Sequence, residues 1–171
     1  MVKLHLGCGR DIKEGFVNID HFKGEGVDVV CNLGHEKLPF DDNTIDVVYA
    51  NSFIEHLDCY ETDFLLDELY RVCKPEAIIE FISPHYLAPA SSRVWHKQRI
   101  SEGYFNEYAY DSDRMSLDSK PYFKISYKLT YMRYKPEGRP RFLPFLLILP
   151  CNIQFKLKVV KGHEGRKKNE F

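Results

Sequence analysis

Five short apolar runs, separated by turns or by one helix, fill the first half of this 171-residue chain and constrain its fold most strongly. Each run stops at a glycine or a polar residue, and the fourth is almost wholly apolar, which is typical of a strand buried on both faces. Strands that alternate with helices or loops indicate a parallel α/β sheet. The runs are Lys3–Leu6, Phe16–Ile19, Val27–Cys31, Ile45–Ala50 and Ala77–Ile82.

One amphipathic helix is predicted between Tyr60 and Cys73. Apolar residues recur there at helical spacing, and Pro75 ends the helix because proline cannot continue it. Asp58 or Thr62 is expected to cap its first turn. The helix therefore separates the fourth and fifth strands, as a parallel sheet requires.

The second half has a different character. Residues 85–119 are aromatic and polar, with one helical candidate near Ser101–Ala109, and a long irregular stretch of this kind is often a binding loop or lid. Apolar and polar residues then alternate over Phe123–Tyr134 and Ile153–Val159. This period of two predicts an antiparallel strand pair.

Size and composition fit one soluble domain over residues 1–171. We expect three parts: a cofactor-binding half (1–84), an acceptor or lid region (85–119) and a basic strand pair (120–171). Five cysteines without a CxxC pair lack the spacing of a zinc site and the parity of a disulfide framework, so we expect a reduced, cytoplasmic protein without a bound metal. No signal peptide or membrane span is apparent.

Charge is unevenly distributed although the net charge is −1. Residues 1–119 carry 22 acidic and 11 basic side chains, whereas residues 120–171 carry 3 acidic and 13 basic ones. The basic part suits an anionic partner, which includes a nucleic acid or another phosphate-bearing acceptor. Alternatively, its lysines only protect a sheet edge from pairing.

Polar residues and glycines mark the ends of the first three strands. Gly7-Cys8-Gly9 allows a sharp turn and close approach of a ligand, Asp20 can accept hydrogen bonds from both hydroxyls of a ribose, and Asn32 can bond an adenine amino group. A dinucleotide fingerprint would need a third glycine, which is missing here. A ligand with a ribose but no pyrophosphate fits these positions better.

Several blocks resemble the type 11 group of S-adenosylmethionine-dependent methyltransferases, which are class I, Rossmann-like enzymes. They are LHLGCGRDIKEGFVNID, DVVCNL, LPFDDNTIDVVYANSFIEHL and ELYRVCKPEAIIEFISPHY, over roughly residues 3–86. The resemblance implies an α/β fold with a mostly parallel sheet, S-adenosylmethionine as cofactor, and methyl transfer to an acceptor. The implied cofactor-binding positions are Leu6, Gly7, Cys8, Gly9, Asp20, His21, Asn32, Leu33, Asn51, Ser52 and Phe53.

Roles for several of these positions follow from the resemblance alone. Gly7 and Gly9 would lie beneath the methionine portion, Asp20 would hold the ribose, and Asn32 with Leu33 would face adenine. Ser52 and Phe53 would line the site beside the sulfonium.

The chain also departs from the group's pattern. His5 stands where the group has an acidic residue, the segment between the first two strands is too short for the usual long helix, and Asn32 replaces an aspartate. These differences keep a non-catalytic S-adenosylmethionine-binding module open as an alternative. A nucleotide-dependent oxidoreductase is a further alternative.

Transfer of an activated methyl group needs a positioned acceptor and, for some acceptors, a proton-accepting side chain. His85, His56 and His96 are the candidates, with His85 favoured because it follows the fifth strand. The stretch Asn51-Ser52-Phe53-Ile54 lacks the Asn-Pro-Pro-aromatic pattern typical of enzymes that methylate base amines. A small-molecule or phosphate-bearing acceptor is therefore favoured, with a nucleic acid kept as an alternative.

Overall fold

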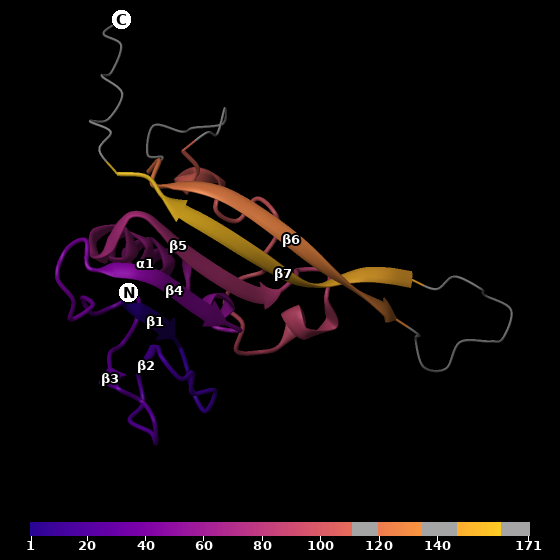
Figure 1. Ribbon diagram of the computed structural model, residues 1–171. Helices are drawn as coiled ribbons and strands as arrows, with labels where there is room; N and C mark the ends of the chain where they lie inside the picture. The colour runs from indigo at the N-terminus through magenta and orange to yellow at the C-terminus, as the bar shows by residue number, and fades with distance from the viewer. Residues whose placement is uncertain (111–119, 135–146, 162–171) are drawn as a thin grey trace, which may run out of the picture.

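A computed structural model describes residues 1–110, 120–134 and 147–161 of the chain (Figure 1). Its strands form a single seven-stranded sheet in the order β3-β2-β1-β4-β5-β7-β6. The strands are β1 (Lys3–Leu6), β2 (Val17–Asp20), β3 (Val29–Val30), β4 (Ile45–Asn51), β5 (Cys73–Pro84), β6 (Phe123–Tyr134) and β7 (Leu147–Val159).

The sheet is mostly parallel, as predicted. Strands β1 to β5 pair in parallel, and β7 runs antiparallel to both of its neighbours, β5 and β6. All five predicted N-terminal strands and the antiparallel C-terminal pair are thus present. Rossmann-like α/β architecture follows from this order, because the chain moves outward from β1 to β3 and then restarts at β4 on the other side of β1.

Three predicted strands had wrong bounds. The fifth was predicted over Ala77–Ile82, but β5 runs from Cys73 to Pro84, because β4 and β7 pair with it over this longer range. The third strand is only two residues long, because β3 lies at the sheet edge and pairs with β2 alone. The last strand begins at Leu147, well before the predicted Ile153, since β6 offers pairing partners along its whole length. Figure 1 shows the resulting two-stranded ribbon extending past the rest of the sheet.

Helix α1 (Cys59–Val72) packs on one face of the sheet. Asp58 is its N-cap, and Glu61 completes a capping box, because the side chain of each accepts a hydrogen bond from the other's backbone N–H. The buried face of the helix and the sheet residues beneath it share one core, which includes Leu65, Leu69, Val72, Leu4, Val48, Ile79, Phe81 and Phe155. Burial of this apolar stripe is the main stabilising term for the helix.

The first three connections are turns rather than helices, and α1 is the sole α-helix within the described residues. The sheet face opposite α1 therefore carries partly exposed side chains such as Tyr49 and Glu80, with Lys156 exposed beside them. Lys13 covers part of this face by placing its Nζ 4.6 Å from the centre of the Tyr49 ring. The short segment between the first two strands is thus accommodated without a helix.

Residues 85–110 pack closely on the α1 side of the sheet. The helix expected near Ser101–Ala109 is wrong: the segment forms turns and one short 3₁₀ helix, η3 (Asn106–Tyr108). Its conformation is fixed by Phe105, whose buried ring stacks on Phe81 at 5.5 Å and meets Phe155 edge-on at 4.8 Å. Insertion of this aromatic ring overrides the weak helical pattern. Residues 111–119 of the predicted lid region lie outside the described residues.

Candidate functional site

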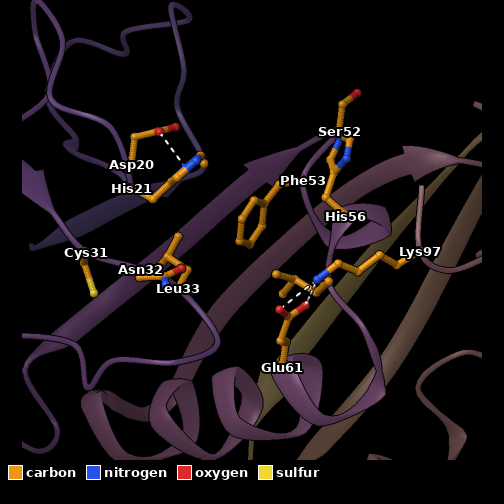
Figure 2. A pocket seen from close by; sticks show the side chains of 12 residues that line it. Asp20, His21, Cys31, Asn32, Leu33, Ser52, Phe53, His56, Glu61 and Lys97 are labelled. Carbon is orange, nitrogen blue, oxygen red and sulfur yellow. Dashed lines mark hydrogen bonds and ion pairs between the residues drawn. The ribbon is translucent and has the colours of Figure 1, made fainter. Parts of the chain in front are cut away.

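A pocket opens at the carboxyl edge of the parallel strands, where open α/β sheets bind ligands (Figure 2). Its volume is about 370 Å³, which lies within the range of roughly 300–1,000 Å³ typical of small-molecule sites. The wall is formed by residues that end or follow the first four strands, the start of α1 and one lysine from the loop after β5. These residues are Gly7, Asp20, His21, Cys31, Asn32, Leu33, Ser52, Phe53, His56, Leu57, Glu61 and Lys97.

Asp20 ends β2 and is largely buried. Its Oδ2 accepts a hydrogen bond of 2.8 Å from the backbone N–H of Gly9, and its Oδ1 accepts one of 3.1 Å from that of Phe22. The Nδ1 of His21 also lies 3.1 Å from Oδ1. A carboxylate has about four lone-pair sites, so the two backbone N–H groups hold Asp20 in place, one site stays open, and the exposed His21 ring would have to move away for a second ligand hydroxyl to bind.

Gly7 and Phe53 meet in the middle of the pocket. Gly7 has a φ of +59°, and a Cβ added there would lie 2.3 Å from Cδ2 of Phe53. The ring can therefore lie against the chain only because residue 7 has no side chain. Figure 2 shows the Phe53 ring between the Asp20–His21 side of the pocket and the Glu61–Lys97 side.

The turn after β3 forms the next part of the wall. Leu33 is 5% exposed and Asn32 is exposed, so an apolar and an amide side chain adjoin at this end of the pocket. The backbone N–H of Asn32 donates a 2.9 Å hydrogen bond to Oε2 of Glu36, which fixes the turn. Cys31 is buried and lines the pocket, and burial raises the pKa of its thiol, which therefore stays neutral.

Ser52 directly follows β4 in a strained conformation. Its φ is +51°, a region that non-glycine residues rarely adopt, and its N–H donates a 2.8 Å hydrogen bond to the carbonyl of Ile82 on β5. Strain of this kind is concentrated at functional sites, where the surrounding structure maintains it. The turn at Ser52 directs Phe53 into the pocket and starts η1 (Ile54–His56).

Glu61 and Lys97 form an ion pair in the pocket wall that the sequence analysis missed. Lys97 Nζ lies 2.7 Å from one oxygen of Glu61, and His35 Nε2 lies 2.8 Å from the other. Burial opposes ionisation of Glu61, but hydrogen bonds from Lys97, the Asp58 N–H and His35 outweigh it and lower the pKa of this carboxyl. The capping-box spacing of Asp58 and Glu61 was the one sequence signal for this residue.

Some predicted cofactor-binding residues lie beside the pocket rather than in its wall. Leu6 is a fully buried core residue, Cys8 is buried, and Gly9 reaches the site through its hydrogen bond to Asp20. Asn51 is exposed at the end of β4. Their roles as ligand contacts stay predictions.

The three candidate histidines have different surroundings. His56 lines the pocket, and its ring meets that of His96 at right angles with 4.9 Å between their centres. His85 is 1% exposed, and its Nδ1 accepts a 3.3 Å hydrogen bond from the N–H of Leu87. His85 Nε2 lies 3.3 Å from a carboxylate oxygen of Glu102, outside hydrogen-bonding geometry. Their proton-accepting roles stay predictions, and the geometry brings two of the three together at the pocket.

His5, which replaces the group's acidic residue, is also buried. Its Nδ1 lies 3.2 Å from Oδ1 of Asn18 on β2. Burial lowers the pKa of His5, which therefore stays neutral at physiological pH. His5 is thus a neutral structural partner of β2 and is absent from the pocket wall.

The strand order and the position of the pocket are those of the Rossmann-like methyltransferase fold. Residues 4–81 match the family described as "Methyltransferase domain". The chain is therefore similar to methyltransferases over 78 of its 171 residues (81 − 4 + 1), a little under half of its length. A search of curated proteins finds no sequence that matches it.

Solved methyltransferase structures share the fold over most of their length. A SAM-dependent methyltransferase from Archaeoglobus fulgidus is 16% identical, with a TM-score of 0.65 over 91% of this chain and 85% of that one. A possible histamine N-methyltransferase from Thermotoga maritima is 13% identical, with a TM-score of 0.59 over 92% and 81%. A SAM-dependent methyltransferase from Methanosarcina mazei is 15% identical, with a TM-score of 0.59 over 93% and 92%. These likenesses establish the fold.

None of the helices within the described residues is both long and apolar enough to cross a membrane.

Proposed function

We propose that the pocket after β1 to β4 binds S-adenosylmethionine, and that Asp20 accepts hydrogen bonds from its ribose hydroxyls. The observation that carries this proposal is the Asp20 carboxylate in the pocket wall, held by the N–H groups of Gly9 and Phe22 with acceptor sites left over. Asn32 and Leu33 then face the adenine, with the buried leucine against the ring and the exposed amide near its amino group. The residue types in the pocket fit this cofactor.

The methyl-transfer end of the pocket is then formed by Ser52 and Phe53. S-adenosylmethionine supplies a methyl group already activated by the sulfonium charge. The chain's own part is to orient the donor, exclude water with the Phe53 ring, and hold an acceptor close by. Glu61 and Lys97, on the opposite side of that ring from Asp20, provide charged groups that an acceptor would meet.

The acceptor is proposed to be a small molecule that carries an anionic or phosphate group. Its support is charge: Lys97 stands in the pocket wall with Phe53, and Lys128 and Lys156 line a separate shallow hollow of about 300 Å³ on β6 and β7, together with Ser126, Tyr127 and Gln154, that could hold the anionic part of a larger acceptor. Substitution of Lys128 and Lys156 by glutamine is expected to weaken binding of inorganic pyrophosphate, followed by NMR chemical shifts of the full chain. Equal shifts in the variant and the wild type would mean that these lysines only protect the sheet edge.

A reducing, cytoplasmic location is part of the same proposal. It rests on five free cysteines, an odd number without a CxxC pair. Retention of activity in a reducing buffer, with loss after mild oxidation of exposed Cys59, would support it.

Isothermal titration with S-adenosylhomocysteine tests the cofactor site. Asp20→Asn retains an oxygen that can accept from Gly9 but loses the charge, so we expect affinity to fall about 10- to 100-fold, which corresponds to charge-assisted hydrogen bonds of roughly 1.5–3 kcal/mol. Asp11→Asn, an exposed aspartate paired with Lys13, is the matched control. Equal affinities of the two variants would remove Asp20 from the ribose role.

A further inference from the structure

Glu55, His56 and His96 form a cluster at the edge of the pocket. One possible ligand atom from each residue lies within 4.8 Å of those from the other two. Glu55 and His56 belong to η1, directly after β4, whereas His96 comes from the loop after β5. The Glu55 carbonyl holds this loop in place by accepting hydrogen bonds from the N–H groups of Lys97 at 2.9 Å and Gln98 at 3.2 Å.

Two polar atoms of the cluster are buried without a hydrogen-bond partner. Glu55 is 1% exposed, and its Oε2 accepts a 3.0 Å hydrogen bond from the hydroxyl of Ser83, but its Oε1 has no partner. The Nδ1 of His96 is likewise buried and unpaired. Lys97 does not neutralise Glu55, because its ammonium group pairs with Glu61. An unpaired buried carboxylate oxygen is destabilising, and a bound cation would remove that penalty.

The third member of the cluster is oriented by the backbone. His56 Nδ1 lies 3.3 Å from the carbonyl oxygen of Trp95, which leaves Nε2 free to bind another group. Imidazoles that bind metals typically donate their second N–H to a carbonyl or carboxylate in this manner.

We propose that Glu55, His56 and His96 bind a divalent first-row transition metal ion such as Zn²⁺. Two imidazoles and one carboxylate are a donor set of Zn²⁺ and Fe²⁺, whereas Mg²⁺ and Ca²⁺ prefer oxygen ligands alone. Ligand atoms on one tetrahedral Zn²⁺ lie about 3.4 Å apart, because each is about 2.1 Å from the ion. The ligand atoms, now within 4.8 Å of one another, would therefore draw together by up to about 1.4 Å on binding the ion.

The position of the site suggests what the ion does. His56 lines the pocket together with Ser52 and Phe53, so an ion held by His56 would lie at the edge of that pocket. If the proposed function holds, an acceptor oxygen or nitrogen bound to the ion would lie next to the methyl donor. His56 and His96 are then metal ligands rather than proton acceptors. Metal binding itself does not depend on the proposed cofactor site.

Sequence spacing could not reveal this site. His56 and His96 lie 40 positions apart (96 − 56), and no pair of cysteines or histidines in the chain has the short spacing of a zinc motif. They meet because the loop after β5 folds back onto η1 through the Glu55 carbonyl.

Titration of the full, metal-free chain with Co²⁺ tests the proposal, because Co²⁺ reports its ligands by visible absorption. We expect one Co²⁺ per chain, a spectrum without thiolate charge-transfer bands, and displacement by Zn²⁺. Glu55→Gln, which keeps an oxygen acceptor for Ser83, and His96→Gln should each weaken binding at least about tenfold. His35→Gln is the matched control, and near-UV circular dichroism checks that the variants are folded.

Unchanged Co²⁺ affinity in both folded variants would overturn the proposal, as would thiolate bands that disappear in Cys59→Ser. Absence of stoichiometric binding to the wild type would overturn it as well. Asp20→Asn should keep full Co²⁺ affinity while its S-adenosylhomocysteine affinity falls about 10- to 100-fold. This variant therefore separates failure of the metal site from failure of the cofactor site.

Discussion

The ring of Phe53 lies against the backbone of Gly7, so closely that a Cβ at residue 7 would be 2.3 Å from Cδ2 of the ring. Residue 7 also has a φ of +59°, in the left-handed region. Two independent constraints thus favour glycine here, one from its own backbone and one from a side chain 46 positions further along (53 − 7). The neighbouring Gly9 has a φ of +52°, but a Cβ added there would have no atom within 4 Å, so only the backbone constraint applies to it.

Gly7→Ala should therefore destabilise the protein more than Gly9→Ala. Both variants incur the left-handed backbone penalty, about 1–2 kcal/mol, but only Gly7→Ala also displaces the Phe53 ring. We expect the free energy of unfolding, measured in urea, to fall by at least about 1 kcal/mol more for Gly7→Ala, as is usual for overpacking.

The double variant Gly7→Ala/Phe53→Ala provides the control for this comparison. Removal of the ring eliminates the clash, so the alanine at position 7 should be less destabilising in the Phe53→Ala background than in the wild type. Additive effects of the two substitutions would contradict the assigned contact.

Much of the site could be predicted because its residues sit at strand ends. Asp20, Asn32 and Ser52 each follow an apolar run, and parallel pairing brings the carboxyl ends of such runs to one edge. Lys97 and Glu61 could not be predicted in this way, because they lie 36 positions apart and meet only when the loop after β5 packs on α1. Tertiary contacts of this kind leave no periodic signal in the sequence.

Stability should fall in acid through the titration of Glu61. Its pKa is lower in the folded protein than the usual 4.5, so the ionised carboxylate stabilises the fold. This contribution is complete above the unfolded-state pKa, about 4.3, and is lost as the pH falls through the lower folded-state pKa. Glu61→Gln should therefore be less stable than the wild type at pH 7, and the difference should narrow below about pH 4.

Urea unfolding across this pH range measures the effect. Glu25→Gln is the matched control, because Glu25 is exposed on the loop between β2 and β3. If the difference in stability between the wild type and Glu61→Gln stayed constant over the whole acid range, the role of this carboxylate would be contradicted.

Asp58 links the stability of α1 to the pocket, since its capping box fixes Glu61. Asp58→Ala leaves the N–H groups of Tyr60 and Glu61 without their side-chain acceptor. We expect the free energy of unfolding to fall by about 1 kcal/mol. The salt bridge between Lys97 and Glu61 should weaken as well, because Glu61 is then less firmly held. Asp58→Asn should be nearly as stable as the wild type, because asparagine caps helices as well as aspartate does. A similar loss in both variants would show that charge, rather than capping, is what matters at this position.

Phe105 should behave as a core residue although it lies in the irregular region after β5. Its side chain is 1% exposed, with its ring stacked on Phe81 and edge-on to Phe155, so Phe105→Ala should lower the free energy of unfolding by roughly 3–5 kcal/mol. Tyr127→Ala, at a residue 53% exposed on β6, should lower it by less than about half as much. Thermal or urea unfolding compares the two variants directly. Similar losses would mean that residues 85–110 pack loosely on the sheet, and that this region opens as a lid instead of completing the core.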